Sequence, residues 1–272
     1  MKKIRILVIG DVVGEPGCKV LARLLPSLKE KYKVDAVIVN GENSAKNGRG
    51  ITPAIMQEFK DLGVNVVTSG NHLWAKQNIV PYLESHDDLL RPANYPGACP
   101  GKGVAIFAVS GVSIAVANVQ GRVFFRELTD CPFRAMQTML SYIKQHTPIT
   151  IVDFHAEATA EKLGLAYFLD GKVSAVVGTH THVQTADERI LPGGTAYISD
   201  IGMVGSLNSM IGFKKESALR AMMTQMPVRF EVDYEGPYVF CAVLLNIDVE
   251  TGKALSIERI RIIDDTLALT KE

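Results

Sequence analysis

Cysteine and net charge are both scarce in this sequence, and each scarcity argues against a class of protein. The four cysteines are scattered over 272 residues with no C-x-x-C pair. This spacing argues against a disulfide framework and a thiolate zinc site, and it favours free thiols in a reducing compartment. Lysine plus arginine and aspartate plus glutamate both number 29. Without an overall basic charge, we expect no stable nucleic-acid partner and no attraction to membranes.

Long apolar runs are absent too, since no stretch approaches the roughly 18 apolar residues of a membrane-spanning helix. The basic first residues lead into a short apolar run that Asp11 interrupts, which is typical of a core strand and not of a signal peptide. Together with the scarce cysteines, this predicts a cytoplasmic protein without a membrane partner. Its 47% hydrophobic and 21% charged residues are typical of a globular protein with a sizeable core.

Short apolar runs rich in β-branched residues predict buried strands in the first two-thirds of the chain. These runs are Arg5–Ile9, Asp35–Val39, Val64–Thr68, Ile149–Phe154 and Val173–Val177, with a hairpin over 104–119 between the third and the fourth. Helical patterns alternate with the strands. The helix expected over Cys18–Tyr32 contains Pro26, which should kink or split it, and another helix is expected over Ala75–Ser85.

The rest of the sequence changes to mostly strand patterns. We expect one helix over about Lys215–Met223 and strands over Thr195–Ser199, Val228–Val232, Tyr238–Ile247 and Ser256–Ile263. No linker, internal repeat or low-complexity tract divides the chain. The sequence therefore predicts an α/β fold in a single domain over residues 1–272, a sandwich of two mixed sheets flanked by helices.

The segment GTHTHV at 178–183 places two of the six histidines one residue apart, directly after an apolar run. In an extended backbone, alternate residues point to the same side, so His180 and His182 could present two imidazoles to one metal ion. An H-x-H pair in a loop can equally be two solvated polar residues. The decision depends on whether other polar clusters complete a ligand set.

Such clusters follow each of five predicted strands at its carboxyl end: Asp11, Glu42-Asn43, Asn71-His72, His155, and His180 with His182. Open α/β sheets bind ligands in the crevice outside those ends, so the clusters should converge on one pocket. The alternative is separate turn chemistry at each loop. Carboxylate, amide and imidazole ligands without a thiolate suit iron or manganese, or zinc as the alternative. Without His72, the clusters hold two carboxylates, two amide oxygens and three imidazoles. These seven ligands are too many for one ion and about right for two.

These motifs resemble those of the calcineurin-like metallophosphoesterases. GDVVG at 10–14, NGENSA at 40–45, GNH at 70–72 and GTHTHVQTAD at 178–187 are most similar to the bacterial YmdB-type branch, a family of cyclic-nucleotide phosphodiesterases. The resemblance implies an α/β/β/α metallophosphoesterase-like fold and an enzyme that hydrolyses phosphodiesters, with a small-molecule cyclic nucleotide as substrate. A homo-oligomer is compatible with the sequence.

The resemblance also assigns roles to the eight residues. It implies a first metal bound by Asp11, Glu42, Asn43 and His182. It implies a second metal bound by Glu42, Asn71, His155 and His180, so that Glu42 bridges the ions. A hydroxide activated by the metals would attack phosphorus, and His72 would protonate the leaving oxygen. The alternative for His72 is that it caps the following helix or holds an asparagine in place.

Two positions depart from the wider superfamily. Its first motif is usually D-x-H, but this chain has Asp11-Val12-Val13, so one histidine ligand is missing. Its bridging aspartate is replaced by Glu42, with Asn43 beside it. Both departures fit the YmdB-type branch, where the asparagine fills the vacancy. An amide oxygen in place of an imidazole makes the first site harder and leaves the metal open.

Other interpretations stay open at this point. A phosphomonoesterase or a nuclease would use the same metals, and a regulatory protein could keep the site only to bind a nucleotide or RNA. The Asn71-His72 pair argues against the last, because binding alone needs no acid beside the metals. Trp74 could stack on a base or pack in the core. Arg49 could contact phosphate or be solvated, and Glu157 could orient a histidine ligand or begin a helix.

Overall fold

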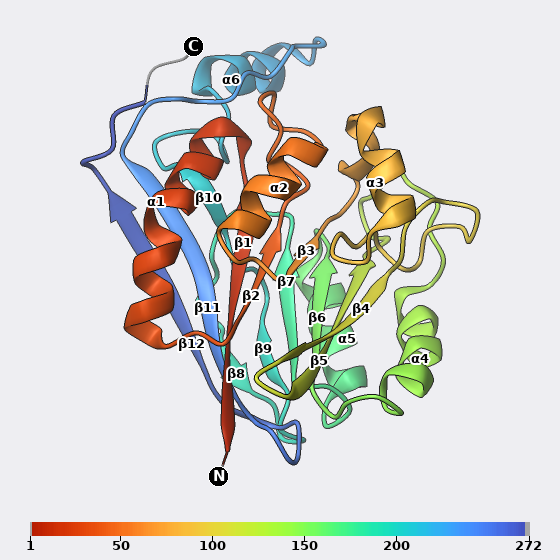
Figure 1. Ribbon diagram of the computed structural model, residues 1–272. Helices are drawn as coiled ribbons and strands as arrows, with labels where there is room; N and C mark the ends of the chain where they lie inside the picture. Colours follow the sequence, from red (N-terminus) through yellow and green to blue (C-terminus); the bar gives the residue numbers. More distant parts are fainter. Residues whose placement is uncertain (1, 270–272) are drawn as a thin grey trace.

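The computed structural model describes residues 2–269 and contains two six-stranded sheets (Figure 1). The first sheet has the order β12-β11-β10-β1-β2-β3, and β11 also pairs directly with β1. Its strands are β1 (Lys3–Val12), β2 (Ala36–Asn40), β3 (Val66–Thr68), β10 (Met203–Ser206), β11 (Tyr238–Asp248) and β12 (Ala254–Asp264). β1, β2, β3 and β10 run parallel, and β11 runs antiparallel to its neighbours.

The second sheet has the order β4-β5-β6-β7-β9-β8. Its strands are β4 (Val104–Val109), β5 (Val112–Gln120), β6 (Thr150–His155), β7 (Ala175–Thr179), β8 (Arg189–Ile190) and β9 (Ala196–Ile198). The central strands β5, β6, β7 and β9 are parallel, while the edge strands β4 and β8 are antiparallel to their neighbours. Both sheets are therefore of mixed direction, as the sequence predicts.

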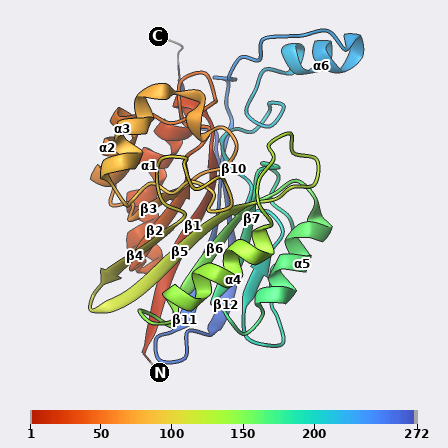
Figure 2. The ribbon, with the colours of Figure 1, turned by 90° about the vertical axis from the view of Figure 1, so that its right-hand side faces the viewer.

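Helices cover the outer face of each sheet, and the inner faces pack on each other (Figures 1 and 2). The first sheet carries α1 (Gly14–Tyr32), α2 (Pro53–Asp61) and α3 (Val80–Ser85), and the second carries α4 (Pro132–Ile143) and α5 (Thr159–Leu169). A sixth helix, α6 (Lys215–Thr224), lies in the long connection between β10 and β11. This α/β/β/α order confirms the predicted fold class.

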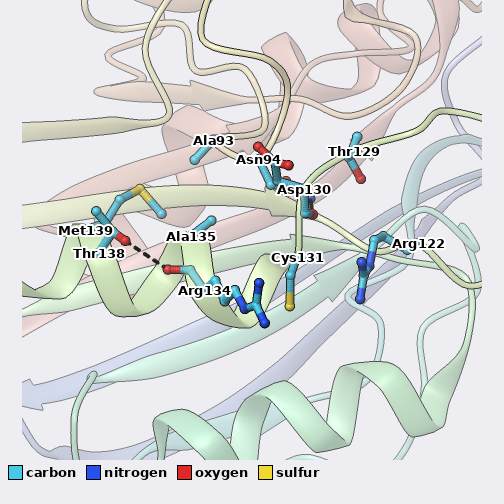
Figure 3. Close-up of a pocket in the computed structure, with 10 residues that line it drawn as sticks. All are labelled: Ala93, Asn94, Arg122, Thr129, Asp130, Cys131, Arg134, Ala135, Thr138 and Met139. Carbon is cyan, nitrogen blue, oxygen red and sulfur yellow. Dashed lines mark hydrogen bonds between the residues drawn. The ribbon is translucent and has the colours of Figure 1, made fainter.

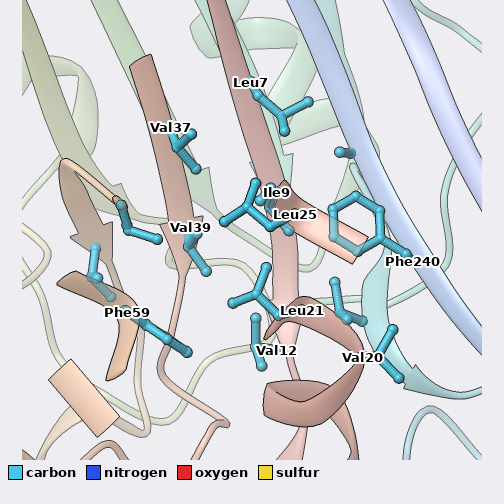
Figure 4. Packing of buried hydrophobic residues seen from close by; sticks show 14 of the residues in the cluster. Leu7, Ile9, Val12, Val20, Leu21, Leu25, Val37, Val39, Phe59 and Phe240 are labelled. Carbon is cyan, nitrogen blue, oxygen red and sulfur yellow. The ribbon is translucent and has the colours of Figure 1, made fainter. Parts of the chain in front are cut away.

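The strands are buried on both faces because each face meets another apolar layer. In β1, Leu7 and Ile9 point toward α1, where Leu21 and Leu25 pack on them (Figure 4). Their neighbours in β1, such as Ile6, point the other way and meet the second sheet. Each fully buried aliphatic side chain contributes about 1.5–3 kcal/mol through burial. Near-continuous apolar runs are the sequence signature of such doubly covered strands.

Three predictions about elements differ from the structure. Pro26 does not split α1, which is one continuous helix because Leu25 and Leu28 hold both halves on the sheet while the proline ring faces solvent. The helix expected over Ala75–Ser85 begins only at Val80, after two 3₁₀ turns. The strand expected over Val228–Val232 is irregular, and only its last residue forms a β-bridge. No helix within residues 2–269 is long and apolar enough to cross a membrane.

Candidate metal centre

Parallel strands of both sheets finish at one end of the sandwich (Figure 1), and the eight predicted site residues lie at or just after these strand ends. Asp11 is near the end of β1, and His155 is the last residue of β6. The loops after β2, β3 and β7 bring the others: Glu42 and Asn43, Asn71 and His72, His180 and His182. Residues separated by up to 171 positions therefore meet because two sheets place their strand ends side by side.

One half of the site converges on the Nε2 nitrogen of His155. It lies 3.1 Å from Glu42 Oε1, 3.2 Å from Asn71 Oδ1 and 3.1 Å from His180 Nδ1. The ligand atoms of Glu42, His155 and His180 all lie within 4.8 Å of one another. These four side chains are the set that the family resemblance assigns to the second metal.

In each of the three histidines, one ring nitrogen contacts an oxygen outside the centre, and the other ring nitrogen faces the centre. His182 Nδ1 donates to the carbonyl of Ile211 at 2.8 Å, and a carbonyl can only accept. His180 Nε2 lies 3.1 Å from a carboxylate oxygen of Glu157. His155 Nδ1 lies 3.0 Å from the Thr179 hydroxyl, which itself donates to Asp153 at 2.7 Å. Metal-binding histidines are typically oriented by such partners. The contact with His180 favours the orienting interpretation of Glu157 over the one in which it begins a helix, since α5 begins only at Thr159.

The other half contains a carboxylate oxygen without a partner. Asp11 is fully buried, and its Oδ2 accepts the backbone N–H of His180 at 3.1 Å. Its Oδ1 has no hydrogen bond among residues 2–269 and lies 3.7 Å from His182 Nε2. A buried carboxylate oxygen left unpaired is costly, and a cation beside the histidine would satisfy it. The donor set and this oxygen fit a metal ion.

Asn43 is in the site, but its amide nitrogen faces the centre. Its Nδ2 lies 3.1 Å from His182 Nε2 and 3.3 Å from Glu42 Oε1, while its Oδ1 lies 2.8 Å from His72 Nδ1. For the amide oxygen to bind a metal there, the side-chain amide of Asn43 would have to flip, which exchanges the positions of Oδ1 and Nδ2. Asn71 already directs its oxygen at the centre.

The charges of the centre are strongly coupled. Burial opposes the ionised form of Glu42, but the adjacent His155 and His72 together outweigh it and hold the pKa of Glu42 below its usual range. Burial likewise opposes charge on His155, yet Glu42 raises the pKa of His155 to about 9. Burial and the neighbouring His155 lower the pKa of His180 to about 3. Burial raises the pKa of Asp11 to about 6. In the metal-free protein, the positive charge beside the Glu42 carboxylate is therefore the proton of the His155 imidazolium.

The backbone of the H-x-H loop is not extended. His180 and His182 have φ values of 98° and 64°. Their rings lie in different halves of the site, His180 beside His155 and His182 beside Asn43. Lys162 and Asp200, both fully buried, hold this conformation. Asp200 Oδ2 accepts from the Thr181 N–H at 3.0 Å and from Lys162 Nζ at 2.8 Å, and Lys162 also donates to the Thr179 carbonyl at 2.9 Å. Nothing in the sequence marks this pair, because Lys162 is an ordinary residue of a helical pattern.

The centre opens into a cavity of about 430 Å³ that Glu42, Asn43, His72, His180 and His182 line. Arg49 also lines this cavity, whereas Trp74 packs edge-on against Tyr95 with ring centroids 4.7 Å apart. Trp74 is therefore a packing residue.

A cavity of about 550 Å³ lies elsewhere, at the start of α4 (Figure 3). Arg122, Cys131 and Arg134 line it, and none of the predicted ligands does. The smaller cavity is the candidate active site because the converging ligands open into it.

The comparison with protein families agrees with this geometry. A sequence model described as YmdB-like protein matches residues 7–260. The chain belongs to the YmdB-like family. The resemblance seen in the motifs is therefore confirmed over nearly the whole chain, and the matched range contains the eight residues of these motifs.

Relatives of this YmdB-like protein cover it almost end to end. It is 47% identical over 261 residues to the 2′,3′-cyclic-nucleotide 2′-phosphodiesterase of Bacillus subtilis, covering 96% of this chain and 98% of the relative. The crystal structure of a Mycoplasma pneumoniae phosphatase has a TM-score of 0.91 and 36% identity, covering 98% of this chain and 96% of that one. A hypothetical protein from Thermus thermophilus has a TM-score of 0.89 and 39% identity, covering 96% and 100%.

Proposed function

We propose that this YmdB-like protein is a metal-dependent phosphodiesterase that hydrolyses 2′,3′-cyclic nucleotides. The observation that carries the proposal is the convergence of Glu42, Asn71 and His180 on His155 Nε2, with all contacts at 3.1–3.2 Å. The activity in the name of the Bacillus subtilis relative, at 47% identity, supports the substrate class.

The residues would hold two transition-metal ions, iron or manganese with zinc as the alternative. Asp11, Glu42, Asn43 and His182 would hold the first, and Glu42, Asn71, His155 and His180 the second. When bound, such ions supply positive charge to the phosphate oxygens and lower the pKa of water. Glu42 is suited to serve both, since Oε1 faces His155 and the amide of Asn43 at 3.1 and 3.3 Å.

We assign the proton donor to His72. Its backbone N–H donates to Glu42 Oε2 at 3.0 Å, and its side chain, 28% exposed, lines the cavity. Its Nδ1 contacts Asn43, which leaves Nε2 without a hydrogen bond among the described residues. A histidine acts as a general acid in its imidazolium form, which carries a proton on each ring nitrogen. Asn43 Oδ1 accepts the Nδ1–H of His72 in this structure, and the Nε2 proton of the imidazolium is then the one to be donated.

A substrate screen with metal-analysed protein tests the function. We expect 2′,3′-cyclic nucleotides to be hydrolysed faster than 3′,5′-cyclic nucleotides, and an aryl phosphodiester faster than the monoester of the same leaving group. The name of the Mycoplasma pneumoniae structure makes a phosphomonoesterase the second candidate. A preference for the monoester with inert cyclic nucleotides would select that candidate. No hydrolysis of any ester by metal-replete protein would leave a role in binding only.

Three further expectations accompany this function. We propose that the chain acts as a single domain, which the apolar core shared by both sheets supports. A cytoplasmic location and a homo-oligomer stay predictions from the sequence.

A further inference from the structure

The cavity beside the metal centre has two chemically different walls. The polar wall consists of Glu42, Asn43, Arg49, His72, Glu157, His180, Thr181 and His182. The opposite wall is apolar and comes entirely from the connection between β10 and β11, residues 207–237. We call this second wall the apolar wall, and it consists of Met210, Ile211, Phe213, Ala218, Met222 and Phe230.

Much of the apolar wall is open to solvent. Ile211 is 47% exposed, Met222 61% and Phe230 37%. The helix α6 that carries Met222 lies at the same end of the molecule as the strand ends, in both views (Figures 1 and 2). Aromatic and methionine side chains grouped beside a polar site, and not buried in a core, are typical of ligand pockets.

The apolar wall is fixed relative to the metal centre. The carbonyl of Ile211 accepts the His182 Nδ1–H bond at 2.8 Å, so a proposed metal ligand and the wall share a direct contact. The Phe213 ring packs on Gly48, where a Cβ atom would lie 2.7 Å from the ring. Phe213 in turn contacts Phe230, with ring centroids 6.0 Å apart and planes at 64°. These contacts hold an apolar surface at a set position across the cavity.

Arg49 supplies a positive charge at the edge of the polar wall. It lies in the loop after β2 that also contains Gly48, and it lines the same cavity as His72 and Asn43. A guanidinium beside a phosphate site can bind phosphate oxygens through paired N–H donors.

We propose that the apolar wall is the nucleobase subsite of this enzyme, with Arg49 contacting the phosphate; this rests on the proposed function. A nucleoside phosphate carries a charged group and a flat ring separated by one sugar. The cavity offers a charged wall and an apolar wall within about 430 Å³, a volume typical of small-molecule sites. Every base has a π-face that can stack on Phe230, and a thioether such as Met222 packs well against aromatic rings.

Equilibrium binding tests the subsite separately from turnover. Metal-replete protein would be titrated calorimetrically with adenosine 3′-phosphate and with the methyl riboside 3-phosphate that lacks the base. We expect the wild type to bind the nucleotide at least about tenfold more tightly, within the range of base–aromatic stacking. Phe230→Ala and Met222→Ala should each reduce this ratio at least about fivefold. Arg49→Gln should weaken both ligands by a similar factor, because both carry the phosphate.

Met223→Ala is the matched control, because Met223 is the next residue of α6, is 82% exposed and does not line the cavity. It should leave the ratio unchanged. An unchanged ratio in Phe230→Ala and Met222→Ala, or an equal fall in Met223→Ala, would overturn the proposal. Base-dependent binding without hydrolysis of any ester would reject the proposed function and keep the subsite. Hydrolysis of cyclic nucleotides with no base dependence would reject the subsite alone.

Discussion

His72 is the residue at which proton donation can be separated from metal binding. General acid catalysis contributes about 10²–10⁴ in rate. We therefore expect His72→Ala to keep both metals and to lose kcat on that scale for cyclic nucleotides, whose leaving group is an alkoxide. An aryl diester with a nitrophenolate leaving group needs less protonation and should lose much less. Metal analysis and the two rate ratios on this variant make the measurement.

The alternative role for His72 is structural. It does not cap the following 3₁₀ turn through its side chain, but its Nδ1 does contact Asn43 at 2.8 Å. If His72 only holds Asn43 in place, His72→Ala should lose metal and should slow both substrates equally. Equal penalties would remove His72 from the acid role.

Metal binding should release a proton from the Glu42–His155 pair. With its pKa raised to about 9, His155 is protonated at pH 7.5 in the metal-free protein, and coordination requires its Nε2 lone pair. We expect about one proton to leave His155 at pH 7.5 when the second site fills, and none above pH 10, where the imidazole is already neutral. Calorimetry in two buffers of different ionisation enthalpy measures this number. A binding enthalpy independent of the buffer at pH 7.5 would contradict it.

The residues that converge at the site could be predicted from the sequence because each follows an apolar run that forms a strand. Glu157 could also be named because it lies two residues after His155, but Asp153 and Asp200 could not be predicted in this way. Asp153 lies inside the strand β6, and Asp200 follows β9, 18 residues after the second histidine of the H-x-H pair. Their contacts depend on which strands become neighbours, and sequence spacing does not determine this.

The backbone conformation of the H-x-H loop depends on the ion pair between Lys162 and Asp200. Both side chains are only 1% exposed, and the pair binds two backbone groups of residues 179–181. Breaking a buried pair by removing one partner costs about 3–5 kcal/mol. Lys162→Met should lower the free energy of unfolding on that scale and weaken metal binding, because the left-handed conformations at 180 and 182 lose their support. Urea denaturation and metal titration make the two measurements.

The control is Lys172→Met, which removes an exposed lysine just beyond the same helix, α5. The Lys172 ammonium group donates to the Phe168 carbonyl and lies 4.5 Å from the centre of the Phe168 ring. These are surface contacts, so its removal should change stability by about 1 kcal/mol or less. Equal losses of stability in the two variants, or wild-type metal affinity in Lys162→Met, would show that the ion pair does not hold the loop.

Among the elements, most buried strands and the helix α6 were predictable, whereas the buried strand β10 and the irregular segment 228–232 were not. Doubly covered strands need continuous apolar residues, and their runs stand out in the sequence. Met203–Ser206 forms β10 although it contains glycine and serine, because β1 and β11 lie on either side of it. Val228–Val232 also has a strand pattern, but among the described residues it pairs only through an isolated bridge between Val232 and Phe213. Strand formation there is decided by neighbours and not by local preference.

At the scale of the whole molecule, the metal centre joins the two sheets. Glu42 and Asn71 follow strands of the first sheet, and His155 and His180 belong to the second. Ions bound only by the folded protein stabilise it by about 4 kcal/mol when present at 1,000 times their dissociation constant. We expect metal loading of the stripped protein to raise Tm by several degrees. His180→Ala and His182→Ala should each keep part of the shift, and Glu42→Ala should abolish it. A full shift in Glu42→Ala would contradict a shared carboxylate.

The central claim, that converging side chains of both sheets form a two-metal phosphodiesterase site, is tested most directly by one titration. Stripped protein would be loaded stepwise with manganese or iron while the initial rate of hydrolysis of a 2′,3′-cyclic nucleotide is followed. We predict no hydrolysis without metal and a rate that rises until about two ions are bound per chain. Full activity of the stripped protein in chelator, or saturation at one ion per chain, would contradict the claim.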